Sequence, residues 1–285
     1  MKFDSALADN RPVKVIRPRQ SLIEVLSAGL MSLWSHKSLF LEMTLLRLKV
    51  RYKQSLLGWI WAVIPSLLLM ITYTLIFSKV IGLDSGELPY ALFVFAGLIP
   101  WTFFATSVST ATNGIVTHRY LISRVGFPRE IIPLSYVAAA LVDLAIGILM
   151  LTAMNYYFGG SLTLHALNVI VVIVVLVIFS VAVALCCSSF QARFRDIGVA
   201  MPLFLQVLMF ATPVVYSSAV VPQNIKEIYF LNPLAILIEA FRQAAVLGSN
   251  PNASQMIYCA TVSIVCLVFS YILFKRLDAT LADVI

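Results

Sequence analysis

The chain has 285 residues, of which 61% are hydrophobic and only 12% are charged, and its formal net charge is +7. A soluble domain is roughly 45–50% apolar and about 25% charged, so this chain has too few polar side chains to cover a soluble surface. The composition excludes a soluble enzyme, a disordered chain and a disulfide scaffold. It predicts an all-α integral membrane protein with several crossings.

Residues 1–54 are predicted to form a cytoplasmic tail and an interfacial helix. The stretch 38–53 is amphipathic, with two apolar stripes separated by basic flanks, and Arg47 and Arg51 share one of these flanks. A helix of this kind suits the cytoplasmic leaflet, with lipid on one side and protein on the other. A plain membrane anchor without a part in the mechanism is the alternative.

Five stretches of 25 or more residues lack charge apart from Asp143. A helix crosses about 30 Å of hydrocarbon in roughly 20 residues, so four stretches accommodate one crossing each. The longest accommodates two, because 156–161 supplies a turn in its middle. We expect a membrane domain over 55–275 and a cytoplasmic tail over 276–285. The six predicted transmembrane helices lie near 56–78, 89–112, 131–155, 165–189, 198–217 and 255–274.

The basic residues predict the orientation of these crossings. With both termini in the cytoplasm, 17 of the 20 Lys and Arg residues fall on the cytoplasmic side. Cytoplasmic loops carry an excess of Lys and Arg, so this arrangement is strongly favoured over its reverse. The positive net charge therefore reflects membrane topology, and we expect contact with membrane lipid and none with nucleic acid.

Residues 218–250 lie outside by this topology, yet they are strongly apolar. Asn232 is placed to cap a helix that has Pro233 at its first position. Glu239 and Arg242 are three residues apart and can pair on one helix face, either as a simple surface pair or in a gating role. An apolar segment too short to cross the bilayer predicts a re-entrant hairpin between the last two crossings. We expect these four residues to contribute to an outer gate.

Polar and aromatic groups inside the bilayer give two further expectations. Asp143 lies near the middle of the third crossing and must face protein or water, either as a pathway residue or as a hydrogen-bonding link between helices. Aromatic residues recur near the membrane faces and could form an ordinary interfacial belt or a stacking surface for sugar rings. The candidates for such a substrate path are Trp59, Trp61, Tyr73, Tyr216, Tyr229 and Phe230.

Motifs for catalysis and metal binding are missing from the sequence. None of the three histidines is near a second residue of a metal-binding type, and no nucleophile motif or phosphate-binding loop occurs. We therefore expect no catalytic residue, no metal and no cofactor in this chain. If ATP drives transport, a separate polypeptide must bind it together with Mg²⁺.

Five short segments, taken together in their order and spacing, carry a family resemblance. The chain resembles the permease subunit of type-2 ABC exporters, in particular the branch that exports O-antigen, capsule and teichoic-acid polymers. The resemblance implies a six-helix subunit of the bacterial inner membrane that forms a homodimer. It further implies two cytoplasmic ATP-binding subunits and a lipid-linked polysaccharide substrate. The segments are 51–61, 127–134, 193–197, 231–234 and 238–242.

An ATPase outside the membrane can act only through the cytoplasmic surface of a permease. The connection 113–130 is the longest one there after the N-terminal region, and 118–125 can form a short basic helix. Alternatively, these basic residues merely hold the topology against anionic lipid. The candidates for coupling to the ATPase are Arg47, Arg51, Arg119, Arg124, Pro128 and Arg129.

Other functions remain open at this point. The same scaffold could export a drug or a small lipid. A membrane-embedded transferase of lipid-linked sugars would have clustered Asp, Glu or His in interfacial loops, and here such residues are scattered. An ion-coupled transporter would carry more intramembrane charge than Asp143 alone.

Overall fold

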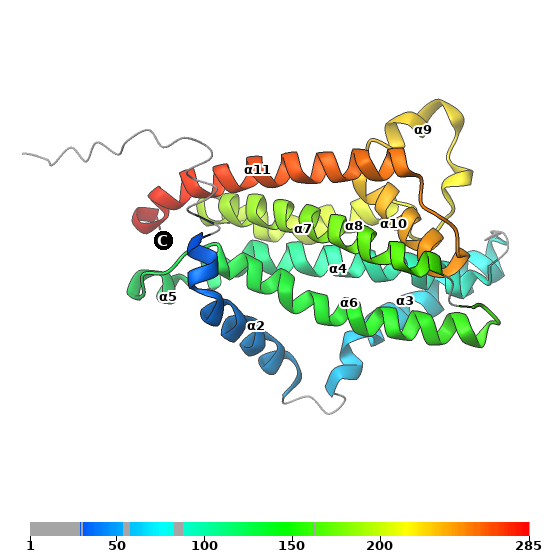
Figure 1. Cartoon of the computed structure of the whole chain (residues 1–285), viewed down its shortest axis with the longest axis horizontal. Helices are drawn as coiled ribbons and strands as arrows, with labels where there is room; N and C mark the ends of the chain where they lie inside the picture. Colours follow the sequence, from blue (N-terminus) through cyan, green and yellow to red (C-terminus); the bar gives the residue numbers. More distant parts are fainter. Residues whose placement is uncertain (1–28, 30, 54–57, 83–87, 162–163, 285) are drawn as a thin grey trace, which may run out of the picture.

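The computed structural model describes residues 29, 31–53, 58–82, 88–161 and 164–284, and no strand occurs among them. Four long helices, α4 (Tyr90–Thr117), α6 (Ile131–Tyr157), α7 (Asn168–Arg193) and α11 (Ala253–Val284), run along the longest axis of the molecule (Figure 1). The shorter elements are α2 (Lys37–Tyr52), η1 (Gly58–Ala62), α3 (Ile64–Tyr73), η2 (Thr74–Val80), α5 (Arg119–Arg124), η3 (Leu164–Leu167), α8 (Asp196–Phe210), η4 (Ser218–Val220), α9 (Gln223–Tyr229), α10 (Pro233–Arg242) and η5 (Gln243–Leu247).

The described part of the chain has four helices long and apolar enough to cross a membrane, and five if the bent pair of α9 with 233–247 counts as one span. These four coincide with the second, third, fourth and sixth predicted crossings. The turn expected between the third and fourth is present, and Gly159 has a φ of +84° there, which a glycine tolerates. The all-helical, multi-pass architecture is thus confirmed.

The first and fifth predicted crossings correspond to shorter apolar helices, Ile64–Val80 and Asp196–Phe210. The first begins with Pro65 in its first turn and ends in the π-helical turn η2. The other ends at Phe210, and Pro213 follows within three residues, where a helix cannot continue. Both helices are shorter than the uncharged stretches with which they overlap.

Helix α4 forms the centre of the core. It packs against α6 and α7 along its length and against α3, α8 and α10 over shorter stretches. Consecutive side chains from Leu92 to Ile99 are buried, so this helix is surrounded by protein on all sides. An apolar helix without a polar face fits this position.

Helix α2 crosses the bundle obliquely and leaves it toward its own C-terminal end (Figure 1). It packs mainly on α6, burying Met43, Leu48 and Tyr52. Leu45 and Val50 remain exposed. One side of this helix thus contacts protein while the other is exposed, and its position at a membrane interface stays a prediction.

Candidate functional site

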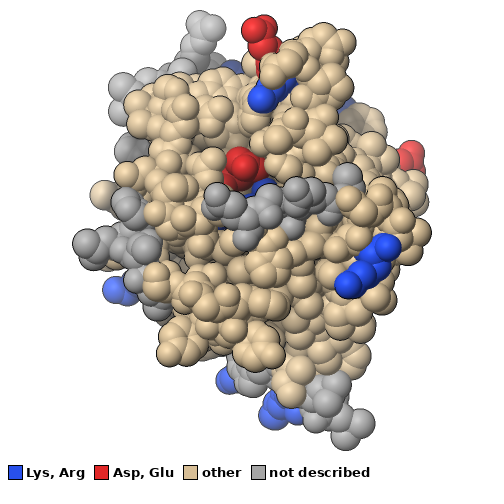
Figure 2. Space-filling model, turned by 90° about the vertical axis from the view of Figure 1, so that its right-hand side faces the viewer, with Lys and Arg blue, Asp and Glu red and all other residues tan. Residues whose placement is uncertain are grey.

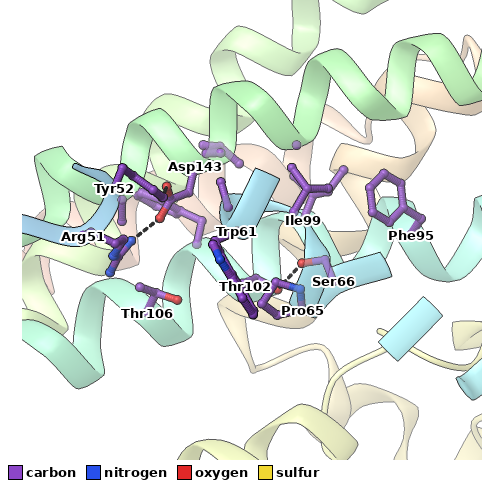
Figure 3. Close-up of a pocket in the computed structure, with 16 residues that line it drawn as sticks. Arg51, Tyr52, Trp61, Pro65, Ser66, Phe95, Ile99, Thr102, Thr106 and Asp143 are labelled. Carbon is purple, nitrogen blue, oxygen red and sulfur yellow. Dashed lines mark hydrogen bonds and ion pairs between the residues drawn. The ribbon is translucent and has the colours of Figure 1, made fainter. Parts of the chain in front are cut away.

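A cavity of about 450 Å³ lies between α2, η1 and α3 on one side and α4 and α6 on the other (Figure 3). Its lining combines a few polar side chains with apolar groups, a composition typical of ligand sites. The polar and aromatic groups that concern us are Arg51, Tyr52, Trp61, Ser66, Thr102 and Asp143.

Asp143 accepts hydrogen bonds from Arg51 and Tyr52 at one end of this cavity (Figure 3). The carboxylate therefore joins the middle of α6 to the last turn of α2. The side chains of Arg51 and Asp143 are 39% and 16% exposed, so the pair borders open space on one side. Burial raises the pKa of Tyr52 to about 12, which keeps its hydroxyl protonated as a donor to Asp143.

Arg47, one helical turn earlier, also turns toward α6. Its guanidinium stacks on the Tyr136 ring, 3.3 Å from the centroid, and its Nε donates to the Ser135 hydroxyl at 2.8 Å. Its Nη2 is buried and has no hydrogen-bond partner among the described residues. A hollow of about 350 Å³ lies here, and it is lined by Arg47, Arg51 and His118.

His118 completes this hollow from the end of α4. Its Nδ1 bonds to the Gly114 carbonyl at 2.8 Å, an arrangement that requires the proton on Nδ1. Burial lowers the pKa of His118, and the nearby charge of Arg47 lowers it further. His118 is therefore neutral at pH 7, and the positive charge of the hollow comes from the two arginines.

The predicted aromatic path residues fall into separate groups. Trp61 is 49% exposed and lines the cavity of Figure 3. Tyr73 packs on Phe77 against the core. The side chain of Trp59 lies outside the described part of the structure.

The remaining aromatic candidates meet beside α9, at the right-hand end of the bundle in Figure 1. The hydroxyl of Tyr229 donates to that of Tyr216 at 3.3 Å, and Phe230 packs edge-on against Tyr229.

The predicted outer-gate residues form one compact unit. The Asn232 side chain accepts a hydrogen bond from the backbone of Leu234, and Pro233 begins α10, so the predicted cap is confirmed. The predicted Glu239–Arg242 pair is also present, at 2.9 Å. Figure 2 looks onto this end of the molecule, where most of the visible surface is uncharged.

Arg242 is buried to 1% exposure and has several partners in addition to Glu239. It donates to the carbonyl of Pro213 at 2.7 Å and to that of Phe93 at 3.3 Å. Its guanidinium also lies 3.7 Å from the centroid of the Phe93 ring. The Pro213 carbonyl lies beyond the end of α8, whereas the Phe93 carbonyl belongs to α4, and a sequence pattern does not reveal that one arginine contacts both.

The predicted coupling residues of the 113–130 connection lie at the other end of the bundle. Arg119 and Arg124 are exposed on the short helix α5, and Arg124 covers the Tyr120 ring. Pro128 and Arg129 precede α6, and Arg129 pairs with Asp278 of α11 at 3.0 Å. Neither Arg119 nor Arg124 forms an ion pair with another residue in the described part of the chain.

The start of α6 contains a buried ion pair that the sequence analysis missed. Glu130 is fully buried, and Lys275 of α11 donates to it at 2.6 Å. The hydroxyl of Tyr271 donates to the same carboxylate oxygen. The sequence does show a charged residue, Glu130, directly before a long apolar stretch. Its partner Lys275 lies 145 residues further along the chain, so the pair could not be inferred from spacing.

Comparison with known proteins now identifies the family. Residues 39–246 match the sequence profile described as "ABC-2 type transporter". The chain belongs to the ABC-2 type transporter family. This match contains most of α2, the lining of both hollows beneath it and the whole of α10 with Arg242.

Several curated relatives of this ABC-2 family member are named permeases. The O-antigen export system permease protein RfbA of Myxococcus xanthus is 28% identical over 237 residues, covering 82% of this chain and 90% of the relative. A protein of the same name from Klebsiella pneumoniae is 30% identical over 202 residues, covering 70% and 77%. The polysialic acid transport protein KpsM of Escherichia coli is 21% identical over 234 residues, covering 80% and 89%.

Proposed function

We propose that this chain is the membrane-embedded, channel-forming subunit of an ATP-driven exporter of lipid-linked polysaccharide across the bacterial inner membrane. The observation that carries the proposal is the ABC-2 match over most of the helical bundle, together with relatives named for O-antigen export and polysialic acid transport. Since the sequence lacks a phosphate-binding loop, two copies of a separate cytoplasmic subunit would bind ATP and Mg²⁺.

The topology we propose has six crossings and both termini in the cytoplasm. The short helix α5 and the C-terminal end of α11 lie at the same end of the bundle, which fits the distribution of basic residues (Figure 1). Helix α3 with η2, and helix α8, supply the two shorter crossings. The bent pair of α9 and α10 would then be re-entrant.

We propose a homodimer with the polysaccharide path at the interface between the two copies. Both shorter crossings expose large apolar side chains, including Leu68 and Leu75 on one and Leu203 and Val207 on the other. A second copy could cover these faces together with lipid. Tyr216 and Tyr229 would stack on sugar rings near the outer end.

The outer gate we propose consists of α9 and α10. These two segments are bent by 97° relative to each other. Residues 235–240 of α10 are buried, apart from the partly exposed Glu239. Single cysteines placed there should resist a membrane-impermeant thiol reagent added from outside. Labelling as fast as at the exposed Asn224 would mean that this stretch is an ordinary surface loop.

Export in cells tests the whole proposal. The gene is deleted from a strain that displays the surface polymer, and the lipid-linked polymer is measured inside and outside the membrane. We expect the polymer to accumulate inside and to return to the surface when the intact chain is restored. Normal surface polymer in the deletion strain would contradict the proposal and favour a drug or small lipid as substrate.

A further inference from the structure

Two arginines on the same flank of α2 stand over α6 and border open space. Arg47 reaches Ser135 and Arg51 reaches Asp143, eight residues apart on α6, a distance of about 12 Å along the helix axis. The hollow of about 350 Å³ is lined by both, and the cavity of about 450 Å³ is lined by Arg51. The two spaces therefore share one arginine.

The hydrogen bonding of Arg47 is incomplete. A guanidinium has five N–H donors, and Arg47 uses its Nε on Ser135 while its face lies on the Tyr136 ring. Its Nη2 is buried without a partner among the described residues. A buried donor of a charged group is costly to leave unsatisfied, and its preferred partner is an anion. The stacking on Tyr136 fixes the plane of the guanidinium, which favours a planar, two-pronged contact to phosphate.

Arg51 differs from Arg47 because its guanidinium already donates a hydrogen bond to a carboxylate, that of Asp143. Asp143 accepts from both Arg51 and Tyr52, so the carboxylate keeps one donor if the other leaves. Arg51 is 39% exposed and faces the cavity of Figure 3. An incoming anion can therefore take over Arg51 while Tyr52 retains Asp143.

The surroundings of these arginines point to an anion that is attached to a lipid. Val63, Phe95, Ile99 and Leu144 give the larger cavity an apolar wall. Leu45 and Val50 on the outward side of α2 are exposed, so lipid can reach the helix directly. A free anion needs no such apolar wall, whereas the head of a lipid brings its hydrocarbon chain with it.

We propose that Arg47 and Arg51 bind the diphosphate head of a lipid-linked substrate, and that Asp143 competes with this head for Arg51. The proposal rests on the proposed function and assigns to it a substrate-entry site on the flank of α2. Binding would exchange the Arg51–Asp143 contact for a contact with phosphate. When no lipid head is bound, the Asp143 carboxylate would accept the hydrogen bond of Arg51 in its place.

Direct binding tests this site in the permease assembled with its ATP-binding subunits in lipid nanodiscs. The probe is a radiolabelled polyprenyl diphosphate. Arg47→Gln and Arg51→Gln should each weaken binding about tenfold or more, the loss expected for one or two charge-assisted hydrogen bonds. The matched control is Lys49→Gln, which removes one positive charge from an exposed position on the same helix and should leave the affinity unchanged.

Competing ligands separate the possible sources of the anion. Inorganic pyrophosphate should displace the probe only at much higher concentration, because it lacks the hydrocarbon chain. Phosphatidylglycerol in excess should displace little of it. Equal competition by either compound would overturn the assignment to a lipid diphosphate.

Substitutions at Asp143 and Tyr52 test the competition in opposite directions. Asp143→Asn should tighten binding several-fold because Arg51 loses its internal partner. Tyr52→Phe leaves the carboxylate to Arg51 alone and should weaken binding, which gives a second test if Asp143→Asn fails to assemble. Affinities unchanged in both assembled variants, or a loss in Lys49→Gln equal to that in Arg51→Gln, would overturn the proposal.

Export measurements distinguish a failure of this binding site from a failure of the proposed function. If the Arg47→Gln, Arg51→Gln double variant exports polymer normally, the site is wrong while the function stands. If the intact complex binds the probe through these arginines but its deletion leaves surface polymer unchanged, the function is wrong while the anion site stands.

Discussion

Two arginine–carboxylate pairs lie in different parts of this protein, and their surroundings differ greatly. Arg242 of α10 is 1% exposed and donates to three backbone carbonyls in addition to Glu239. Arg51, in the last turn of the oblique helix α2, is 39% exposed and donates a hydrogen bond to Asp143. The first pair is built into the core, whereas the second can exchange its partners. We call the Glu239–Arg242 pair with its backbone carbonyls the fixed joint, and the Arg51–Asp143 pair the displaceable contact.

The fixed joint depends on the backbone around it. Helix α8 ends at Phe210, so the carbonyls of Pro213 and Val214 have no helical partner, and Arg242 donates to both. Gly97 of α4 makes room for the guanidinium, because a Cβ at that position would lie 2.8 Å from it. Removing the arginine would leave a carboxylate and several carbonyls unsatisfied at once.

The largest effect is therefore expected for Arg242→Met. Breaking a buried ion pair by removing one partner costs about 3–5 kcal/mol, so little folded protein should remain in the membrane. Glu239→Gln should cost much less, because Arg242 keeps its carbonyl partners and Glu239 is 21% exposed. Size-exclusion profiles and thermal unfolding in detergent compare the two variants. Equal stability of both would contradict the fixed joint.

The second prediction concerns the space beside Arg242. Gly97→Ala places a Cβ 2.8 Å from both the Arg242 side chain and the Val214 carbonyl, so it should destabilise the fold by about 1–3 kcal/mol. The control is Gly147→Ala, whose Cβ would lie 3.4 Å from the side chain of Ile99. Its thermal unfolding should stay close to that of the original protein. A loss of similar size in both variants would remove the special role of the space at Gly97.

A smaller structural effect is expected at the displaceable contact. Arg51→Gln breaks a partly exposed pair but leaves the Asp143 carboxylate its hydrogen bond from Tyr52, so the melting temperature should fall much less than for Arg242→Met. Polymer export should nevertheless fall strongly, because the substrate-entry site is damaged. Thermal unfolding and surface polymer are measured on the same variant. A large loss of stability together with normal export would mean that the Arg51–Asp143 pair holds the fold together and does not bind substrate.

The smallest structural effect is expected on the short helix α5. Arg119→Glu and Arg124→Glu alter exposed side chains on α5, and exposed substitutions rarely change stability noticeably. If α5 contacts the ATPase, either variant should weaken binding of that subunit or separate ATP hydrolysis from export. Pull-down and coupled ATPase assays measure this. Unchanged binding and unchanged coupling would leave only the role of holding the topology.

The parts of the structure that depend on local sequence could be predicted. Uncharged stretches predicted six crossings, four of which coincide with long apolar helices, and residue spacing predicted the Asn232 cap and the Glu239–Arg242 pair. The six-crossing count, the dimer and the sugar path stay predictions, because they depend on a membrane and on partner chains.

Contacts between distant residues could not be predicted from the sequence. Arg51 and Asp143 are 92 positions apart, and Lys275 and Glu130 are 145 apart. Helix packing brings these groups together, and no periodicity in the sequence encodes which of several charges will meet. The basic flank of α2 was visible, but its approach to α6 depends on packing.

Helix α11 contacts both ends of the molecule. Near its beginning Tyr258 donates to the carbonyl of Leu231 at 2.9 Å, close to the start of α10, and near its end Lys275 pairs with Glu130. The helix has 32 residues and is about 48 Å long. An unbroken α-helix is stiff along its axis. Axial sliding of this rod would therefore displace the α9–α10 turn and the start of α6 together, so the two ends of the transporter are mechanically linked through a single element.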